Sequence, residues 1–159
     1  MLAQLGIGSA NTIPNWVLIL TAFGGQLALA TAQKAPNDFK PAALLLFNPA
    51  VDLVTPATWW AKPIARRISP SKLPVDALPP TLIFHGTGDK RVPIQTVKAF
   101  CRRAREEAGI CEVVSYPGQG HGFYHSNRLS PALGLNPFRD TMDRSEAFFA
   151  RQGIKPTAP

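Results

Sequence analysis

Four short apolar runs, separated by glycine, proline and polar residues, set the pattern of this chain. They span residues 15–22, 42–47, 81–84 and 112–116. The first is a continuous run rich in branched and aromatic side chains, which is typical of a strand buried on both faces and not of a half-exposed one. Asn48-Pro49 and Pro117-Gly118 end the second and fourth runs. The pattern therefore predicts four strands.

Helical patterns fill the intervals between these strands. Residues 26–33 follow the Gly24-Gly25 break and are rich in alanine and leucine, and residues 93–108 repeat apolar side chains every three to four positions. We expect a last helix over 136–151 to cover the sheet with aromatic and aliphatic side chains: Phe138, Met142, Phe148 and Phe149. Residues 52–78, with several prolines and with Trp59 and Trp60, predict an irregular excursion holding one short helix.

The order of these elements indicates the fold class. A strand, a helix and a second strand within about 35 residues form a βαβ unit with parallel strands. We therefore predict an α/β fold with a mostly parallel sheet and helices on both faces. A length of 159 residues supports one domain over 1–159, and the 45% hydrophobic and 17% charged residues are typical of a folded globular chain.

The net charge of +7 does not by itself indicate a nucleic-acid partner. The basic residues are scattered, and the densest group shares its predicted helix with Glu106 and Glu107. No aromatic side chains interleave the basic ones as a stacking platform for bases would require. We expect no nucleic-acid partner.

The two cysteines, Cys101 and Cys111, are too few for a disulfide framework and lack the paired spacing of a zinc site. We expect buried free thiols, and the alternative is a single disulfide across a helix end in an exported protein. No metal or other cofactor is expected.

The first 33 residues carry no charge, and Ala30-Thr31-Ala32 is similar to a signal-peptide cleavage site. A signal peptide would begin with basic residues, however, and Lys34 is the first one in the chain. Gly24-Gly25 also divides the apolar run, which argues against a membrane span. We expect a cytoplasmic protein with no membrane partner, and secretion is the weaker alternative.

Candidate chemistry lies after the third and fourth strands. In an open parallel sheet, ligands bind outside the carboxyl ends of the strands. Asp89 follows the third strand and His121 follows the fourth, 32 residues later. This is the chain order of acid and base in the Ser, Asp, His triad of sheet hydrolases. A turn carboxylate and a surface-loop histidine are the alternatives.

The segments around these two residues make a resemblance specific. Residues 80–93, PTLIFHGTGDKRVP, and residues 116–123, YPGQGHGF, resemble the C-terminal part of the α/β-hydrolase superfamily. Within it, the esterase and dienelactone-hydrolase-like or acetyl-esterase-like branches are the most similar. The resemblance implies that Asp89 is the triad acid and His121 the general base. His85 is expected to be structural, and His125 lies too far along its loop.

The nucleophile of that family has no counterpart in this sequence. Family members carry Gly-x-Ser-x-Gly at a strand-to-helix turn, and alignment on Gly24-Gly25 places Ala22 where the serine belongs. Thr21 and Ser9 are weak alternatives, because Thr21 points to the other side of the strand end and Ser9 precedes the strand. The resemblance implies that the amide of Phe23 is an oxyanion-hole donor, and that a second donor comes from a loop earlier than this chain.

Two functions follow as expectations. The first is hydrolysis of small carboxylic esters through the Asp89–His121 pair, with an unorthodox nucleophile or a water activated by His121. The alternative is a catalytically impaired or truncated hydrolase-fold module used for binding or assembly. We expect a small ester as the ligand and homo-oligomerisation through an exposed edge of the first strand.

Overall fold

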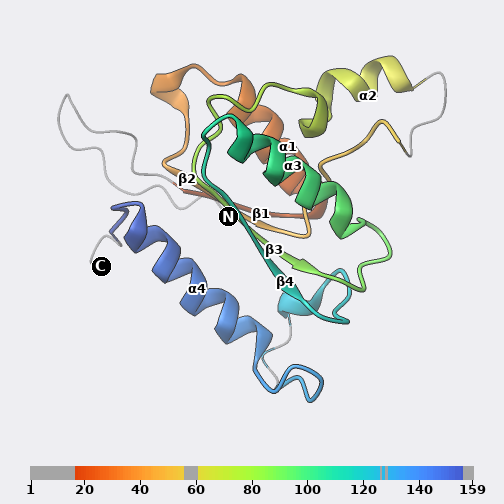
Figure 1. The fold of residues 1–159 in the computed structure, drawn as a ribbon, viewed down its shortest axis with the longest axis vertical. Helices are drawn as coiled ribbons and strands as arrows, with labels where there is room; N and C mark the ends of the chain where they lie inside the picture. Colours follow the sequence, from red (N-terminus) through yellow and green to blue (C-terminus); the bar gives the residue numbers. More distant parts are fainter. Residues whose placement is uncertain (1–16, 56–60, 126, 128, 156–159) are drawn as a thin grey trace.

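The computed structural model of this chain describes residues 17–55, 61–125, 127 and 129–155. Over these residues strands and helices alternate along the sequence (Figure 1). The strands are β1 (Val17–Thr21), β2 (Ala43–Phe47), β3 (Thr81–Gly86) and β4 (Cys111–Tyr116). The helices are α1 (Ala22–Lys34), α2 (Lys62–Ile68), α3 (Ile94–Glu106) and α4 (Pro137–Arg151), with short 3-10 turns η1 (Asn37–Phe39), η2 (Pro70–Lys72) and η3 (Phe123–His125).

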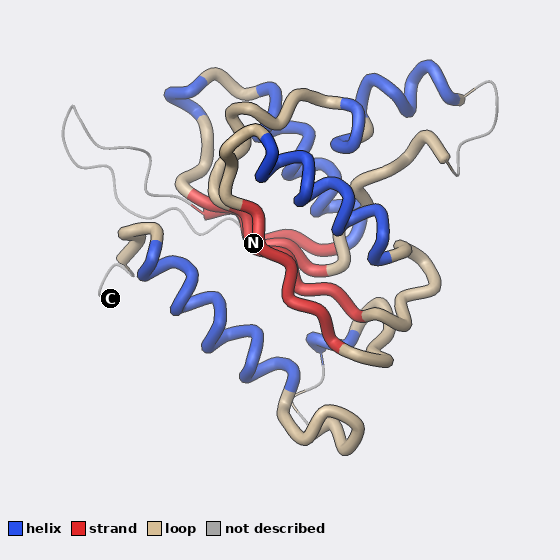
Figure 2. Tube along the Cα trace, in the orientation of Figure 1, coloured by secondary structure: helices blue, strands red, loops and turns tan. Residues whose placement is uncertain are grey.

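In the described part of the chain, the four strands form one parallel sheet in the order β1-β2-β3-β4. Thr21 pairs with Phe47 and Gly86 pairs with Tyr116, so the carboxyl ends of all four strands meet at one edge. Helices α1 and α3 cover one face of the sheet and α4 covers the other (Figures 1 and 2). The predicted α/β class, with a parallel sheet and helices on both faces, is confirmed.

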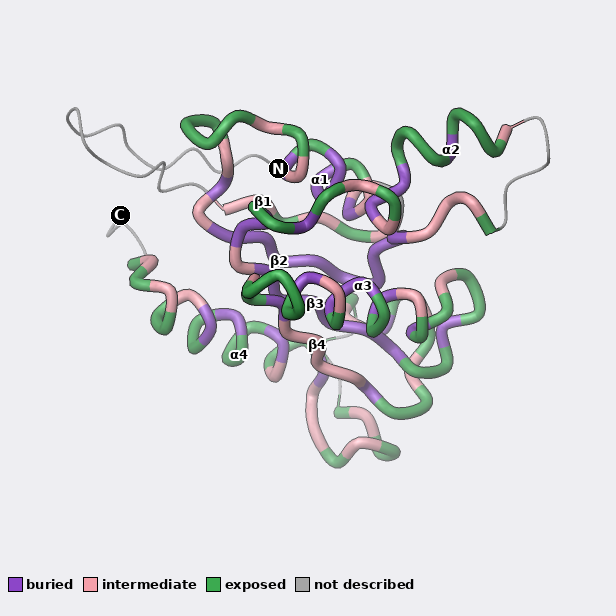
Figure 3. Tube along the Cα trace, turned by 45° about the horizontal axis from the view of Figure 1, so that its top comes forward, coloured by how far each residue is buried: buried purple, intermediate pink, exposed green. Residues whose placement is uncertain are grey.

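The core consists of two apolar clusters, one on each face of the sheet. Every residue of β2 is buried, and β2 and β3 run through the buried centre of the molecule in Figure 3. Leu44 and Leu46 join the cluster under α1 and α3, whereas Leu45 and Phe47 join the one under α4. This division follows from the period of two along a strand, and it explains why the sequence shows no polar alternation there.

Helix α1 begins four residues earlier than the pattern predicts. The Gly24-Gly25 pair was expected to separate strand from helix, but it lies in the first turn of α1. A Cβ atom at Gly25 would stand 2.8 Å from the Cβ of Pro49, so this glycine allows close approach of the helix start to the segment after β2. Gly25 therefore serves packing, and neither glycine breaks the helix.

Helix α4 covers the sheet with part of the expected stripe, because Phe148 and the partly buried Phe149 pack in the cluster on that face, whereas Phe138 and Met142 do not. Phe138 and Met142 are each 41% exposed, whereas Phe148 is fully buried. The other buried residues of the helix recur at Pro137, Thr141 and Ser145. Positions 137, 141, 145 and 148 fall on one helical face, and positions 138 and 142 are turned about 100° away from it. Small polar residues thus lie where large apolar ones were expected.

The cysteines are not free thiols as expected. Cys101 of α3 and Cys111 at the start of β4 form a disulfide with a Cα–Cα distance of 5.2 Å, and both residues are buried. The turn after α3 brings the two together, since β4 runs back along the helix that precedes it. The bond joins helix to strand at the end of β4 opposite to Asp89 and His121.

Residues 61–78 contain one short helix, α2, followed by η2, in line with the irregular excursion predicted for this region. Trp59 and Trp60 lie outside the described residues, as do Ser9 and the first two residues of the strand expected over 15–22. None of the helices in the described ranges is both long and apolar enough to cross a membrane.

Candidate active site

The carboxyl edge of the sheet gathers one notable residue from the end of each strand. Ala22 follows β1, Asn48 follows β2, Asp89 lies three residues after β3, and His121 lies five residues after β4. Because the strands are parallel and in register, these segments emerge side by side at the same edge.

Ala22 occupies the turn between β1 and α1 with no intervening loop. Its φ is +47°, in the left-handed region that costs an L-residue roughly 1 to 2 kcal/mol. This is the sharp strand-to-helix turn on which sheet hydrolases carry a serine, but the alanine side chain holds no nucleophilic atom. The carbonyl oxygen of Ala22 accepts a hydrogen bond from the amide of Ala50 at 3.2 Å, which fixes the turn against the segment after β2.

The other residues considered as nucleophiles lie elsewhere. Thr21 is exposed and ends β1, on the face of the strand shared with Val17 and Ile19, and its hydroxyl forms no capping hydrogen bond to α1. Ser9 is outside the described residues. The amide of Phe23 belongs to the first turn of α1, where backbone N–H groups have no partner within the helix.

Asp89 and His121 meet directly. His121 Nδ1 lies 2.7 Å from Asp89 Oδ2, and the side chain of Asp89 is fully buried whereas that of His121 is 20% exposed. Burial alone would raise the pKa of Asp89, but hydrogen bonds from His121 and from the amides of Val92 and Arg91 outweigh burial and lower that pKa. An ionised carboxylate only accepts hydrogen bonds, so Nδ1 of His121 donates to Asp89, and Nε2 is the ring nitrogen left for a ligand.

Backbone contacts dock the loop of Asp89 against the loop of His121. A Cβ at Gly86 would stand 2.2 Å from the carbonyl oxygen of Gln119, so only glycine fits there. The amide of Gly118 donates to Thr87 Oγ1 at 2.8 Å, and the amide of Gly88 donates to the carbonyl of Gln119 at 2.9 Å. These contacts bring the loop that follows β4 over the end of β3.

His85 is buried beneath the same loop. Its Nε2 donates to the carbonyl oxygen of Val92 at 2.9 Å, and it lies 3.6 Å from Asp89 Oδ2. Burial lowers the pKa of His85, so the ring is neutral and serves as a donor that fixes the turn carrying Asp89. His125, in contrast, is exposed and stacks on Tyr124 with a ring-centre distance of 4.4 Å.

Asn48 is the site residue that sequence reasoning missed. It is fully buried, has a φ of +47°, and donates from Nδ2 to Asp89 Oδ2 at 2.6 Å. From the sequence, Asn48-Pro49 indicates the end of a strand at the ligand-binding edge, but no role in the site is predicted for Asn48. Its placement at a strand end on the ligand-binding edge was the available signal, because asparagine tolerates a positive φ and carries a donor.

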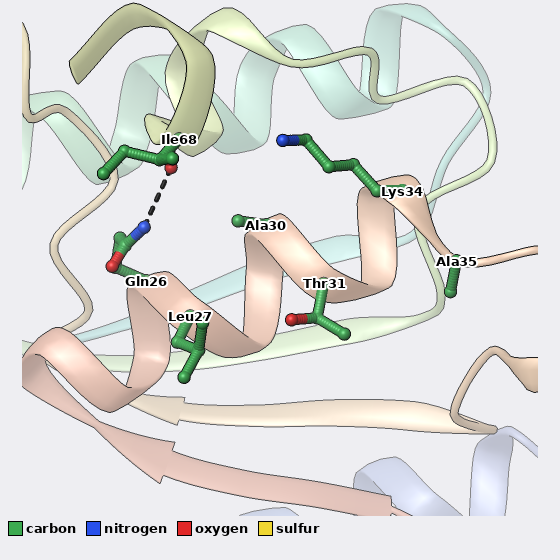
Figure 4. A pocket seen from close by; sticks show the side chains of 7 residues that line it. All are labelled: Gln26, Leu27, Ala30, Thr31, Lys34, Ala35 and Ile68. Carbon is green, nitrogen blue, oxygen red and sulfur yellow. Dashed lines mark hydrogen bonds between the residues drawn. The ribbon is translucent and has the colours of Figure 1, made fainter. Parts of the chain in front are cut away.

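A shallow groove lies away from this edge, along the outer face of α1 beneath α2 (Figure 4). It has a volume of about 490 Å³ and is lined mainly by apolar parts of Leu27, Ala30 and Ile68. Gln26 Nε2 donates to the carbonyl of Ile68 at 2.8 Å and joins the two helices across its end. Ala22, Asp89 and His121 do not line it. Among the described residues, no cluster of three or more His, Cys, Asp or Glu side chains could hold a metal.

Known esterases share this architecture. Esterase 2 of Thermogutta terrifontis, solved after phosphoramylation by tabun, is 26% identical with a TM-score of 0.74 over 91% of this chain and 58% of its own. Its propionate-bound form is 25% identical with a TM-score of 0.72 over 92% and 59%. Esterase LipC of Mycobacterium tuberculosis is 32% identical over 98 residues, which cover 57% of this chain.

This chain matches only part of the length of each relative. The chain spans about a quarter of the length of LipC, 24%, and somewhat more than half of esterase 2. A family model described as the prolyl oligopeptidase family matches residues 21–134, which is more than half of the chain and includes Ala22, Asp89 and His121. On that match, and with the α/β-hydrolase fold that it shares with these esterases, the chain belongs to the prolyl oligopeptidase family.

Proposed function

We propose that this protein hydrolyses small carboxylic esters at the carboxyl edge of its sheet, with His121 as general base and Asp89 as the carboxylate that orients it. The observation that carries the proposal is the 2.7 Å hydrogen bond between His121 Nδ1 and Asp89 Oδ2. One side of the imidazole ring is held by a buried carboxylate, and the ring keeps some exposure to solvent. This arrangement suits a base that must accept a proton at Nε2 from a ligand.

Water is the nucleophile in this proposal, because Ala22 stands where a serine would be. His121 Nε2 takes a proton from a water molecule as the water oxygen bonds to the ester carbonyl carbon, and the carbonyl π electrons move to its oxygen. Asp89 stabilises the imidazolium that forms. The carbon–oxygen bond to the alcohol then breaks, the imidazolium returns its proton to the leaving oxygen, and the products are a carboxylic acid and an alcohol.

The first turn of α1 would stabilise the negative oxygen formed on the way. The Phe23 amide lies at the positive end of the α1 dipole, where an anion is favoured. In better-equipped enzymes, loss of the whole triad leaves roughly 10³- to 10⁴-fold catalysis over water from the oxyanion hole and substrate binding. We therefore expect slow turnover.

The relatives support the choice of ester and acyl chain. Esterase LipC and esterase 2 are both named as esterases, and esterase 2 has been solved with propionate and with butyrate. The family is named after a peptidase, however, so hydrolysis of amide bonds is the competing reaction. Short-chain esters and a prolyl anilide are therefore the substrates to compare.

The test measures release of p-nitrophenol from its acetate and butyrate esters, and of p-nitroaniline from a prolyl p-nitroanilide. We expect ester hydrolysis above the buffer rate, its loss in His121→Ala, and retention in His125→Ala, which removes an exposed histidine of the same loop region. Ester hydrolysis that survives His121→Ala, or that never exceeds the buffer rate, would refute the proposal. Faster cleavage of the anilide than of the esters would assign the site to peptides.

A further inference from the structure

Asn48 is buried at the point where the β1–α1 turn and the Asp89–His121 pair come together, and the mechanism above gives it no part. Its side chain is fully buried. Nδ2 donates to Asp89 Oδ2 at 2.6 Å and makes a longer contact of 3.4 Å with the carbonyl oxygen of Gly120. On the other side, Oδ1 accepts from the amide of Gly86 at 3.4 Å. The side-chain amide of Asn48 thus contacts the end of β3, the Asp89 carboxylate and the loop that carries His121.

The carboxylate of Asp89 is held by four close donors, of which one comes from outside its own loop and the His121 loop. Oδ1 accepts from the amides of Arg91 at 2.8 Å and Val92 at 3.0 Å. Oδ2 accepts from His121 Nδ1 at 2.7 Å and from Asn48 Nδ2 at 2.6 Å. The four donors together fix the rotation of the carboxylate about its own axis, and Asn48 supplies the second donor on the oxygen that holds His121.

The residues after Asn48 fix the opposite part of the site. The amide of Ala50 donates to the carbonyl of Ala22 at 3.2 Å, and Pro49 lies so near Gly25 that a Cβ there would be 2.8 Å from the proline Cβ. Segment 48–50 therefore contacts the β1–α1 turn at one end and the Asp89–His121 pair at the other. Its length sets the spacing between them.

The backbone of Asn48 adopts a costly conformation to make these contacts. Its φ of +47° places it in the left-handed region, where asparagine is several-fold enriched over other non-glycine residues. Glycine would satisfy this backbone with less strain but would offer no donor to Asp89. Both requirements, the positive φ and the amide donor, are met together by asparagine.

We propose that Asn48 is a positioning residue, which holds Asp89 Oδ2 towards His121 and keeps the pair in register with the turn at Ala22. The inference rests on the proposed function, in which His121 is the general base and Asp89 orients it. Without the Asn48 amide, His121 Nδ1 is the last close donor on Asp89 Oδ2, so this oxygen is held less firmly and the Nδ1–H form of His121 loses its preferred partner geometry. Misplacement of a catalytic group by about 1 Å can cost about 10²-fold in rate.

The test reads the tautomer of His121 without substrate, from the ¹⁵N shifts of labelled histidine at a pH where the ring is neutral. His121→Gln identifies the resonances of His121. In the native protein we expect the Nδ1–H form. In Asn48→Gly, which accepts the positive φ and removes only the amide, we expect a mixture of tautomers and a fall in kcat of about 10- to 10²-fold with little change in KM.

Ala108→Gly is the matched control, because Ala108 has a φ of +60° at the end of α3, remote from the pair. It should leave the His121 tautomer unchanged. Asn48→Asp is a second variant, which keeps the size of the side chain. Two carboxyl groups this close share a proton, so the variant still offers a donor to Asp89 Oδ2 and should keep the Nδ1–H preference that Asn48→Gly loses.

Retention of the Nδ1–H form in folded Asn48→Gly would overturn the proposal, and so would its loss in folded Asn48→Asp. Failure of both variants to fold would also overturn it, because Asn48 would then serve stability and not position. The tautomer is read without substrate, so the two proposals can fail separately. If the native protein hydrolyses no ester but Asn48→Gly still loses the Nδ1–H preference, only the proposed function is refuted.

Discussion

Backbone strain marks the edge of the sheet at the scale of single residues. The described part of the chain holds three non-glycine residues with positive φ, and two of them, Ala22 and Asn48, stand at the ends of neighbouring strands β1 and β2. Strained residues cluster at functional sites because the surrounding contacts over-determine them. Ala22 is notable in this respect, since its methyl group gains no hydrogen bond in return for the strain.

Ala22→Ser should convert the turn into a serine site. The hydroxyl would stand on the strained turn, where His121 Nε2 could take its proton, and ester hydrolysis should rise by about 10²-fold or more. Paraoxon, which phosphorylates esterase 2, should also form a serine–phosphate bond with loss of p-nitrophenolate, detected as added mass.

Thr21→Ser is the matched control, since it places a serine one residue earlier on the exposed side of β1. It should remain unlabelled. Labelling of Thr21→Ser, or an inert Ala22→Ser that is folded, would show that the turn is not aligned with His121.

His85 makes stability depend on pH. Burial holds the pKa of His85 below the ordinary value of 6.5. As the pH falls below 6.5, the unfolded chain therefore binds a proton at this residue before the folded chain does. The contribution of neutral His85 to the free energy of unfolding is complete above pH 6.5 and is lost as the pH falls below 6.5. The free energy of unfolding in urea should therefore decline as the pH falls below 6.5.

His85→Gln keeps a donor for the Val92 carbonyl without titrating, so it should flatten this decline, whereas His125→Gln, at an exposed site, should not. The contribution of Asp89 falls in a different window. Its pKa lies below the ordinary value of 3.8, so that contribution is lost only in more acidic solution. An unchanged slope in His85→Gln would contradict the assignment.

At the scale of elements, side chains from different elements are joined at both ends of β4. At its carboxyl end, Tyr116 donates to Asp140 of α4 at 2.6 Å, and Asp140 also accepts from Arg144 at 2.8 Å. Burial raises the pKa of Tyr116, so the phenol stays protonated and keeps this donor. At its start, the Cys101–Cys111 disulfide joins β4 to α3 on the other face.

Removal of the disulfide should destabilise the fold without altering the pair at the far end of the strand. It closes a loop of ten residues, for which chain entropy gives about 2 to 3 kcal/mol. We expect the Cys101→Ala/Cys111→Ala protein to unfold at lower urea concentration, and the native protein to respond in the same way to reductant. Equal midpoints with and without reductant would show that the bond contributes nothing to stability.

At the scale of the whole molecule, the sheet is unevenly covered. β2 and β3 are buried, whereas β1 pairs with β2 and, within the described residues, has no strand on its other side. Ile19 of β1 is 49% exposed. An open strand edge with an exposed branched side chain is a surface on which another strand can pair.

Self-association through this edge stays a prediction. Light scattering after size exclusion should give a mass that rises with concentration towards that of a dimer, and Ile19→Lys should abolish the rise. Ile110→Lys is the control, because Ile110 is similarly exposed, at 45%, just before β4. A monomer mass at all concentrations, or equal effects of the two substitutions, would contradict the prediction.

The sequence by itself determined the four strands and the parallel class of their sheet, and it placed Asp89 and His121 on the loops after successive strands. Continuous apolar runs specify buried strands where both faces of the sheet are covered, as in β2 and β3, but β1, expected to be buried as well, is an edge strand of the described sheet with no buried residue. The loop residues after the strands specify what reaches the carboxyl edge. For Asp89 and His121 the signal was their place after successive strands. The alignment of Gly24-Gly25 with the Gly-x-Ser-x-Gly motif of the family that the sequence resembles placed Ala22 at the expected serine position.

Only the tertiary structure decided how these residues meet. The role of Asn48 depends on the distance between strands that are 41 residues apart at the contact, and no local pattern encodes that distance. The Cys101–Cys111 bond and the exposure of Phe138 likewise depend on how helices are rotated and placed on the sheet. Apolar periodicity fixes which segments are buried, but the contact of one buried polar group with another is decided by packing between elements.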